Sequence, residues 1–190
     1  MPLTTKPLDE STWPAFARLV EAEGGVWGGC WCIAFHLDPN GPKGQCRPHR
    51  ENKERLVLEG RALAALVFDG DEAVGWCQFG RTADLPNIKN RRNYEAELKS
   101  LPEWRITCFY VSKRHRKRGV ANVALAAALN QIASLGGGVV EGYPFDVAGQ
   151  KTSSSFLHAG TLDMFLRLGF ETERMIGKTQ WVVCKTVVPT

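Results

Sequence analysis

The segment Ile106–Leu129, which reads "ITCFYVSKRHRKRGVANVALAAAL", constrains the fold more strongly than any other part of the sequence. An apolar, β-favouring run ends at Val111, a cluster of lysines and arginines follows, and Gly119 then precedes an alanine-rich run. This pattern predicts a strand, a basic loop and a helix from about Gly119 to Leu135. A helix N-terminus has unpaired backbone N–H groups and a partial positive charge, so the junction is suited to binding an anion such as phosphate.

The positive charge of the chain is concentrated in this loop. The 190 residues carry a net charge of +4, and the loop alone supplies five positive charges, from Lys113, Arg114, Arg116, Lys117 and Arg118. A general nucleic-acid-binding protein would carry basic and exposed aromatic residues along a whole face, so we expect no nucleic-acid partner. The alternative is a solvated loop without a ligand. We favour phosphate binding because a strand and a helix flank the cluster.

Periodicity and turn signals predict the remaining elements. Helices are expected at residues 8–25, 52–60, 91–99 and 159–170, strands at 139–147 and 180–188, and a hairpin around Asp69-Gly70-Asp71. No internal repeat or domain linker interrupts this order. We therefore expect residues 1–190 to form a single α/β domain around a mixed sheet.

The sequence contains no secretory signal, and no apolar run approaches the roughly 18–20 residues that cross a bilayer. We therefore expect a cytoplasmic protein without a membrane partner. In such a protein the six cysteines are expected to be reduced thiols. The oligomeric state stays open, with a homodimer as one option.

The spacing Arg116-x-x-Gly119-x-Ala121 resembles the acyl-coenzyme A pyrophosphate loop of the GNAT superfamily of N-acetyltransferases. The ending "MFLRLGF" is similar to the family's late helix and its Leu-Gly-Phe turn, and "PLTTKPLDESTWPAFARLVEAEG" is similar to its first strand and helix. The resemblance implies a mixed, mostly antiparallel sheet flanked by helices, with acetyl-CoA as co-substrate. It also implies transfer of the acetyl group to an amine. We expect a small-molecule or amino-acid-like acceptor, with a protein N-terminus or lysine as the open alternative.

The resemblance also implies which residues bind the coenzyme. The pyrophosphate would lie against backbone amides of Arg116, Lys117, Arg118, Gly119, Val120 and Ala121. Arg114, Arg116 or Lys117 would contact the adenosine-side phosphate. The pantetheine arm would pair with the edge of the strand at Phe109, Tyr110 and Val111. A backbone N–H near Tyr110 or Val111 would polarise the thioester carbonyl.

The catalytic groups are less clear from the sequence. Many GNAT proteins have a tyrosine as general acid on the late helix, and Phe165 occupies that position here. His158 stands where an asparagine is common, and is either an acid, a base or an ordinary surface histidine. Glu141 lies in an apolar strand, where burial of a carboxylate costs free energy unless the group has a partner or a function. It is therefore a candidate general base. The alternative is a side chain that faces solvent or forms a salt bridge. Tyr143 could serve as the acid if its strand continues regularly. Without a catalytic acid, the protein would be a non-catalytic acyl-CoA-binding module.

The segment "GVWGGCWCIAFHLDPNGPKGQCRPH" contains a Cys-Trp-Cys element that resembles one in some bacterial GNAT proteins. Enough side chains for a zinc site are present, namely Cys30, Cys32, His36, Cys46 and His49. Their spacing matches no common zinc template, so we expect no metal. In the GNAT fold this segment would border the acceptor site. Its aromatic residues Trp27, Trp31 and Phe35 are therefore candidates for substrate contact, but ordinary packing is the first interpretation of this segment, substrate contact the second and metal binding the third.

Overall fold

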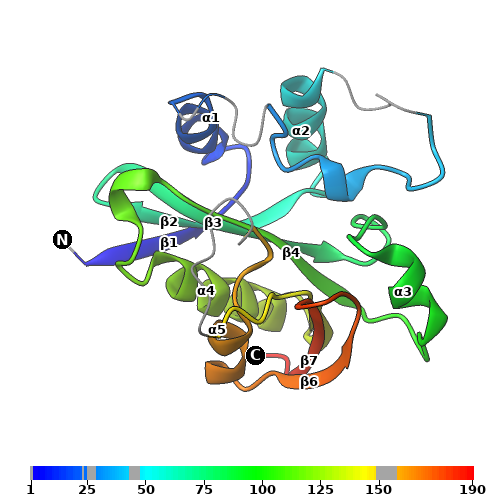
Figure 1. The fold of residues 1–190 in the computed structure, drawn as a ribbon. Coiled ribbons are helices and arrows are strands. Elements are labelled where there is room, and N and C mark those ends of the chain that lie inside the picture. Colours follow the sequence, from blue (N-terminus) through cyan, green and yellow to red (C-terminus); the bar gives the residue numbers. More distant parts are fainter. Residues whose placement is uncertain (1, 23, 25–28, 43–47, 149–157) are drawn as a thin grey trace.

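The computed structural model describes residues 2–22, 24, 29–42, 48–148 and 158–190 (Figure 1). Seven strands form one sheet in the order β1-β2-β3-β4-β5-β7-β6. Neighbouring strands are antiparallel, except that β4 and β5 are parallel. The mixed, mostly antiparallel sheet predicted from the sequence is confirmed.

The elements have the following bounds: β1 Leu3–Pro7, α1 Trp13–Ala22, η1 Ala34–His36, α2 His49–Leu58, β2 Leu63–Asp69, β3 Glu72–Arg81, α3 Arg91–Ala96, β4 Trp104–Val111, η2 Lys113–His115, α4 Val120–Ser134, β5 Gly138–Gly142, α5 Leu162–Arg167, β6 Glu171–Met175 and β7 Trp181–Val187.

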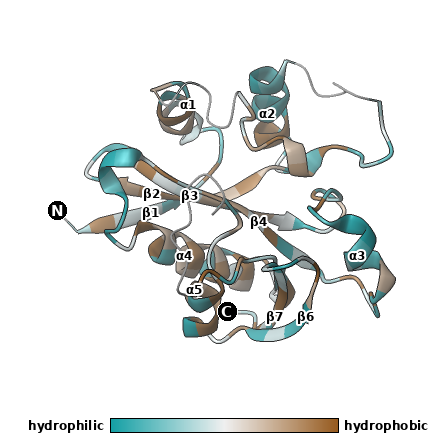
Figure 2. Cartoon of the chain, in the orientation of Figure 1, coloured by the Kyte–Doolittle hydropathy of each residue, from teal (hydrophilic) through white to brown (hydrophobic). Residues whose placement is uncertain are grey.

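The sheet is covered on both faces. Helices α4 and α5 lie on one face, and α1 and α2 lie on the other (Figure 1). One apolar core fills the space between the sheet and α4, and a second, rich in aromatic residues such as Trp13, Phe16 and Trp76, lies beneath α1. Figure 2 shows that α4 is mostly apolar, whereas α2 and α3 are mainly hydrophilic. No helix within the described residues is both long and apolar enough to cross a membrane.

A β-bulge in β4 determines which side chains face each layer. Thr107 is an extra residue, because its neighbours Ile106 and Cys108 pair with consecutive residues of β3. A bulge shifts the alternation of side chains along a strand. Ile106 and Phe109 therefore both belong to the core beneath α4, whereas Cys108 and Tyr110 belong to the core beneath α1.

Helices α1, α3 and α5 are shorter than predicted, and three further differences concern α2, β5 and β6. Helix α2 begins at His49, directly after Pro48, rather than at residue 52. Strand β5 ends at Gly142 instead of continuing to Val147, because Pro144 cannot donate a ladder hydrogen bond. Strand β6 was not predicted. It is a charged edge strand, "ETERM", and lacks the alternation of apolar residues that identifies a half-buried strand.

Candidate active site

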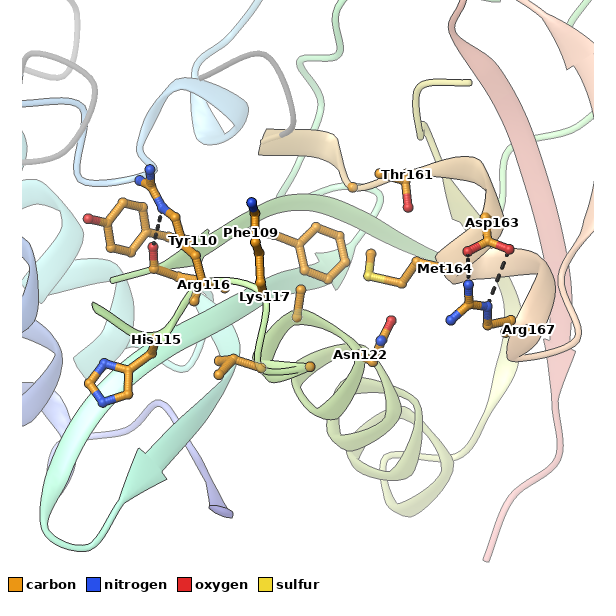
Figure 3. A pocket seen from close by; sticks show the side chains of 15 residues that line it. Phe109, Tyr110, His115, Arg116, Lys117, Asn122, Thr161, Asp163, Met164 and Arg167 are labelled. Atoms are coloured by element: carbon orange, nitrogen blue, oxygen red, sulfur yellow. Dashed lines mark hydrogen bonds and ion pairs between the residues drawn. The ribbon is translucent and has the colours of Figure 1, made fainter. Parts of the chain in front are cut away.

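A cavity of about 440 Å³ lies where β4, the basic loop, α4 and α5 meet (Figure 3). Its walls consist of Phe109, Tyr110 and Val111 from β4, His115, Arg116, Lys117 and Gly119 from the loop, Val120, Ala121 and Asn122 from α4, and Gly160, Thr161, Asp163, Met164 and Arg167 from the α5 region.

The N-terminus of α4 forms one end of the cavity. Helix hydrogen bonding starts with the bond from the Val123 N–H to the Gly119 carbonyl, so the N–H groups of Val120 to Asn122 have no acceptor within the helix. Gly119 has a φ of +78°, and a Cβ atom there would meet nothing within 4 Å. The exposed N–H groups and the helix dipole make this end suitable for an anion.

The open edge of β4 forms the other part of the cavity wall. The parallel pairing of β4 with β5 ends at Ile106 and Gly142. No strand among the described residues pairs with this side of Phe109–Val111, so its backbone groups can bind an extended ligand arm. The cavity therefore connects an anion site to an unpaired strand edge.

Glu141 lies outside this cavity, on β5. Its neighbour Val140 packs beneath α4, so the Glu141 side chain projects to the opposite face of the sheet. The carboxylate is buried and accepts hydrogen bonds from the Tyr94 hydroxyl at 2.8 Å and the Tyr143 hydroxyl at 2.9 Å. Burial raises the pKa of Glu141, against the opposing effects of the two hydroxyls and of the nearby Arg105 guanidinium.

A family comparison identifies the chain. The model described as "Acetyltransferase (GNAT) family" matches residues 31–142, more than half of the sequence. The chain belongs to the GNAT acetyltransferase family. It is an acyltransferase, and acetyl-CoA is its co-substrate, as the sequence predicted.

Solved structures share the GNAT fold at low sequence identity. A Corynebacterium glutamicum protein described as "histone acetyltransferase HPA2 and related acetyltransferase" is 16% identical, with a TM-score of 0.56 over 100% of this chain and 98% of that one. The Escherichia coli ribosomal-protein-S18-alanine N-acetyltransferase is 9% identical, with a TM-score of 0.52 over 100% and 96% of the two chains. The PaiA N-acetyltransferase from Thermoplasma acidophilum, solved with coenzyme A, is 11% identical, with a TM-score of 0.51 over 98% and 99%. No curated protein matches the sequence.

Most of the residues that the GNAT resemblance assigns to the coenzyme line the cavity, but Arg118 does not. Its guanidinium lies 3.5 Å from the Asp69 carboxylate, outside the cavity wall. Arg114 is also elsewhere, in a separate cleft of about 310 Å³ near Arg18 and Asp71. Lys117 has a φ of +61° and Gly119 a φ of +78°, so the loop turns sharply after η2 and sequence proximity did not determine which side chains face the cavity.

The sequence reasoning missed Asn122 of α4 and the wall formed by the α5 region. Thr161 and Asn122 add a hydroxyl and an amide to the cavity wall. Asp163 and Arg167 form an ion pair on the same wall, as Figure 3 shows. The spacing of four residues between opposite charges on a helix predicts this ion pair. The position of the pair beside the cavity depends on how α5 packs against β4.

Phe165 occupies the position where many GNAT enzymes have a tyrosine, and it is a core residue here. It is fully buried, and its ring packs against Phe109 and Phe170. A Cβ atom at Gly142 would lie 2.3 Å from this ring, so the glycine permits the close contact. Phe165 is not part of the cavity wall.

The other candidate catalytic and substrate residues lie beside the sheet rather than in the cavity. His158 is half-buried, and its ring centroid is 6.5 Å from that of Phe35 and 5.9 Å from that of Phe145. Trp31 is buried against Trp13, with their ring centroids 5.9 Å apart, which is a packing role. Trp27 lies outside the described residues.

The histidines of the cysteine-rich segment are engaged by main-chain groups. The Nδ1 atom of His36 lies 2.8 Å from the Asp84 carbonyl oxygen, and that of His49 lies 2.7 Å from the Gly29 carbonyl oxygen. Cys46 is outside the described part of the chain. Within the described part, only Glu141, Glu173 and Cys184 lie close enough together to hold a metal ion, and Glu141 is already bound by two tyrosines.

Proposed function

We propose that this GNAT enzyme transfers the acetyl group of acetyl-CoA to the amine of a small-molecule or amino-acid-like acceptor. The observation that carries the proposal is the single cavity that joins the N-terminus of α4 to the open edge of β4. An extended, phosphate-bearing cofactor fits such a cavity with its phosphates at the helix and its reactive end along the strand.

In this proposal the backbone N–H groups of Val120 and Ala121 hold the pyrophosphate, and Arg116 and Lys117 add positive charge at the mouth of the cavity. The pantetheine arm pairs with Phe109–Val111. A main-chain N–H near Tyr110 or Val111 stabilises the negative charge that develops on the thioester oxygen.

The acceptor amine must lose a proton before it can attack, because an alkyl ammonium has a pKa of about 10. We propose that Glu141 accepts this proton as the general base. Its raised pKa and its burial support the role of a base. The carboxylate does not line the cavity, so the proton would reach it through water or through the hydroxyl of Tyr94 or Tyr143.

The departing coenzyme A thiolate needs less help than an alkoxide would. A thiol has a pKa of about 8.5, so the thiolate can leave without full protonation. This makes the reaction compatible with Phe165 at the position of the usual tyrosine. The Thr161 hydroxyl is a polar group on the cavity wall that could donate a hydrogen bond to the sulfur.

For the acceptor we propose the side of the sheet where Phe35, Phe145 and His158 gather. Phe145 forms an isolated bridge with Thr161, which lines the cavity, so this aromatic group lies next to the coenzyme site. The Lys89 ammonium lies 5.4 Å from the centre of the Phe145 ring and adds a positive charge for an acceptor carboxylate.

The test measures release of free coenzyme A thiol across a panel of small amines, amino acids and peptides with free N-termini. We expect release with at least one small amine or amino acid. Release with peptides alone would show that the acceptor class is wrong. Binding of acetyl-CoA in calorimetry without thiol release on any amine would favour the acyl-CoA-binding alternative.

A further inference from the structure

Two buried cysteines meet on the side of the sheet opposite α4. The Sγ atoms of Cys32 and Cys108 are 3.0 Å apart, although the residues are separated by 76 positions in the sequence. Their exposed fractions are only 2% and 3%. Both are free thiols in the structure, and neither has a place in the acetyl-transfer chemistry proposed above.

The fold holds both sulfur atoms in place. The bulge at Thr107 turns the Cys108 side chain away from α4 and toward α1. Cys32 has a φ of +49° and Trp31 a φ of +51°, a left-handed conformation that residues with a Cβ atom rarely adopt. The Trp31 ring is anchored between Trp13 and Phe16, which keeps the backbone of this segment in position.

A buried ammonium group completes the cluster. Lys53 of α2 is 1% exposed, and its Nζ donates a hydrogen bond to the Gln78 Oε1 at 2.6 Å. The same Nζ lies 3.3 Å from the Nε2 of His36. Burial and the Lys53 charge lower the pKa of His36 to about 2, so this ring is neutral and Nε2 can accept a hydrogen bond.

The two thiols have different acidities. The hydrogen bond between the two thiols lowers the pKa of Cys32; burial opposes this effect, and the Lys53 charge supports it. The same hydrogen bond and burial raise the pKa of Cys108. Cys32 is thus the more nucleophilic partner, because the thiolate is the reactive form, and Cys108 is the neighbouring thiol.

We propose that Cys32 and Cys108 are a reversible redox-modification site that forms a disulfide with a hydroperoxide as the oxidant. The Cys32 thiolate attacks one peroxide oxygen, which gives the Cys32 sulfenic acid and releases hydroxide. The Cys108 sulfur then attacks the Cys32 sulfur, the S–S bond forms, and water leaves. Overall, two thiols and one hydrogen peroxide give one disulfide and two waters.

Formation of the bond requires a small movement. The sulfur atoms must approach from 3.0 Å to about 2.0 Å. The bond would tie the segment before η1 to the middle of β4, and closing so long a loop restricts the unfolded chain. We therefore expect the oxidised protein to have a higher melting temperature than the reduced protein.

The test treats the reduced full-length protein with hydrogen peroxide, blocks the remaining thiols and maps the peptides by mass spectrometry. We expect a crosslinked peptide pair joining Cys32 to Cys108, a loss of two hydrogen masses from the intact protein, and reversal by dithiothreitol. Absence of this crosslink, or a crosslink from Cys32 to Cys30 in its place, overturns the proposal.

Variants separate the roles of the two thiols. In the Cys108→Ser variant, Cys32 should gain oxygen and no disulfide should form. Cys77 is also buried but lies outside the cluster, so the Cys77→Ser variant is the matched control and should form the disulfide as the wild type does. Lys53→Met should slow oxidation roughly threefold for each unit by which the pKa of Cys32 rises, because the thiolate fraction falls about tenfold while each thiolate becomes more nucleophilic. An unchanged oxidation rate in a folded Lys53→Met variant would contradict the role of the ammonium. The wild-type peptide map decides the proposal if that variant does not fold.

Discussion

Lys53 shows how strongly the environment of a single residue changes its chemistry. Its ammonium lies beneath α2 with a hydrogen bond to Gln78, and burial lowers its pKa to about 8. In an unfolded chain the pKa of lysine is about 10.4. Between these two values the unfolded chain binds more protons than the folded one, so folding stability due to this group rises with pH.

This difference predicts the pH dependence of stability. Relative to a Lys53→Met variant, the wild type should gain on the order of 2 kcal/mol of unfolding free energy between about pH 7 and about pH 10. Urea denaturation of both proteins across this range measures the gain. Parallel stability curves for the two proteins would mean that Lys53 keeps an ordinary pKa in the folded state.

Glu141 is the residue on which the proposed proton transfer depends. Glu141→Gln keeps the size of the side chain and a hydrogen-bonding oxygen but removes the base. We expect turnover to fall by about 10²–10⁴, with coenzyme binding unchanged. In the wild type the rate should rise with pH through an apparent pKa above the free-glutamate value of about 4.3, because burial raises the pKa of this carboxyl.

His158→Gln is the matched control for this assignment. Because His158 borders the proposed acceptor site, we expect His158→Gln to raise the KM for the acceptor while lowering kcat much less than Glu141→Gln does. If His158→Gln removes activity and Glu141→Gln does not, the histidine is the base. If neither change affects turnover, positioning and the backbone of β4 supply the rate enhancement, and water removes the proton.

At the scale of elements, the junction of β4 and α4 carries the coenzyme site. Gly119→Glu places a side chain with negative charge in the space where the phosphates would lie, and we expect it to abolish acetyl-CoA binding in calorimetry. Gly60→Glu is the matched control. Gly60 has a φ of +69° and open space around its Cβ position, like Gly119, but it lies after α2, away from the cavity. Normal binding by a folded Gly119→Glu protein would place the coenzyme elsewhere.

The charged side chains of the same loop are expected to differ in effect. Arg116 lines the cavity, so Arg116→Ala should weaken acetyl-CoA binding by roughly tenfold at low salt and less at high salt. Arg118 is paired with Asp69 outside the cavity, so Arg118→Ala should leave the affinity nearly unchanged. Equal losses in the two variants would show that the loop acts only through its overall charge.

At the scale of the whole molecule, coenzyme binding should stabilise the fold, because residues of β4, α4 and the α5 region all line the site. A ligand present at a hundred times its dissociation constant stabilises a folded protein by about 2.7 kcal/mol. We expect a corresponding rise in melting temperature with acetyl-CoA, measured by differential scanning fluorimetry. The Gly119→Glu variant should show no rise, and a rise in that variant equal to the wild type would mean that the stabilisation comes from another site.

The sequence alone determined the features that depend on neighbouring residues. The apolar run before Val111, Gly119 and the alanine-rich run after it predicted the strand, the anion-binding loop and the helix, because local spacing fixes where these elements begin and end. Asp69-Gly70-Asp71 predicted the β2–β3 hairpin for the same reason. The family resemblance of the loop then gave the coenzyme, and the family match confirmed it.

Only the tertiary structure decided the features that depend on strand register and long-range packing. The bulge at Thr107 places the Cys108 side chain on the face opposite Phe109. The local sequence does not predict this bulge, because a bulge is defined by the pairing of β4 with β3. The contact between Cys32 and Cys108 follows from that register and spans 76 positions. Glu141 likewise meets Tyr94 across 47 positions. Such contacts form because distant segments share one buried face, and a sequence pattern records which residues prefer burial but not which partners they find there.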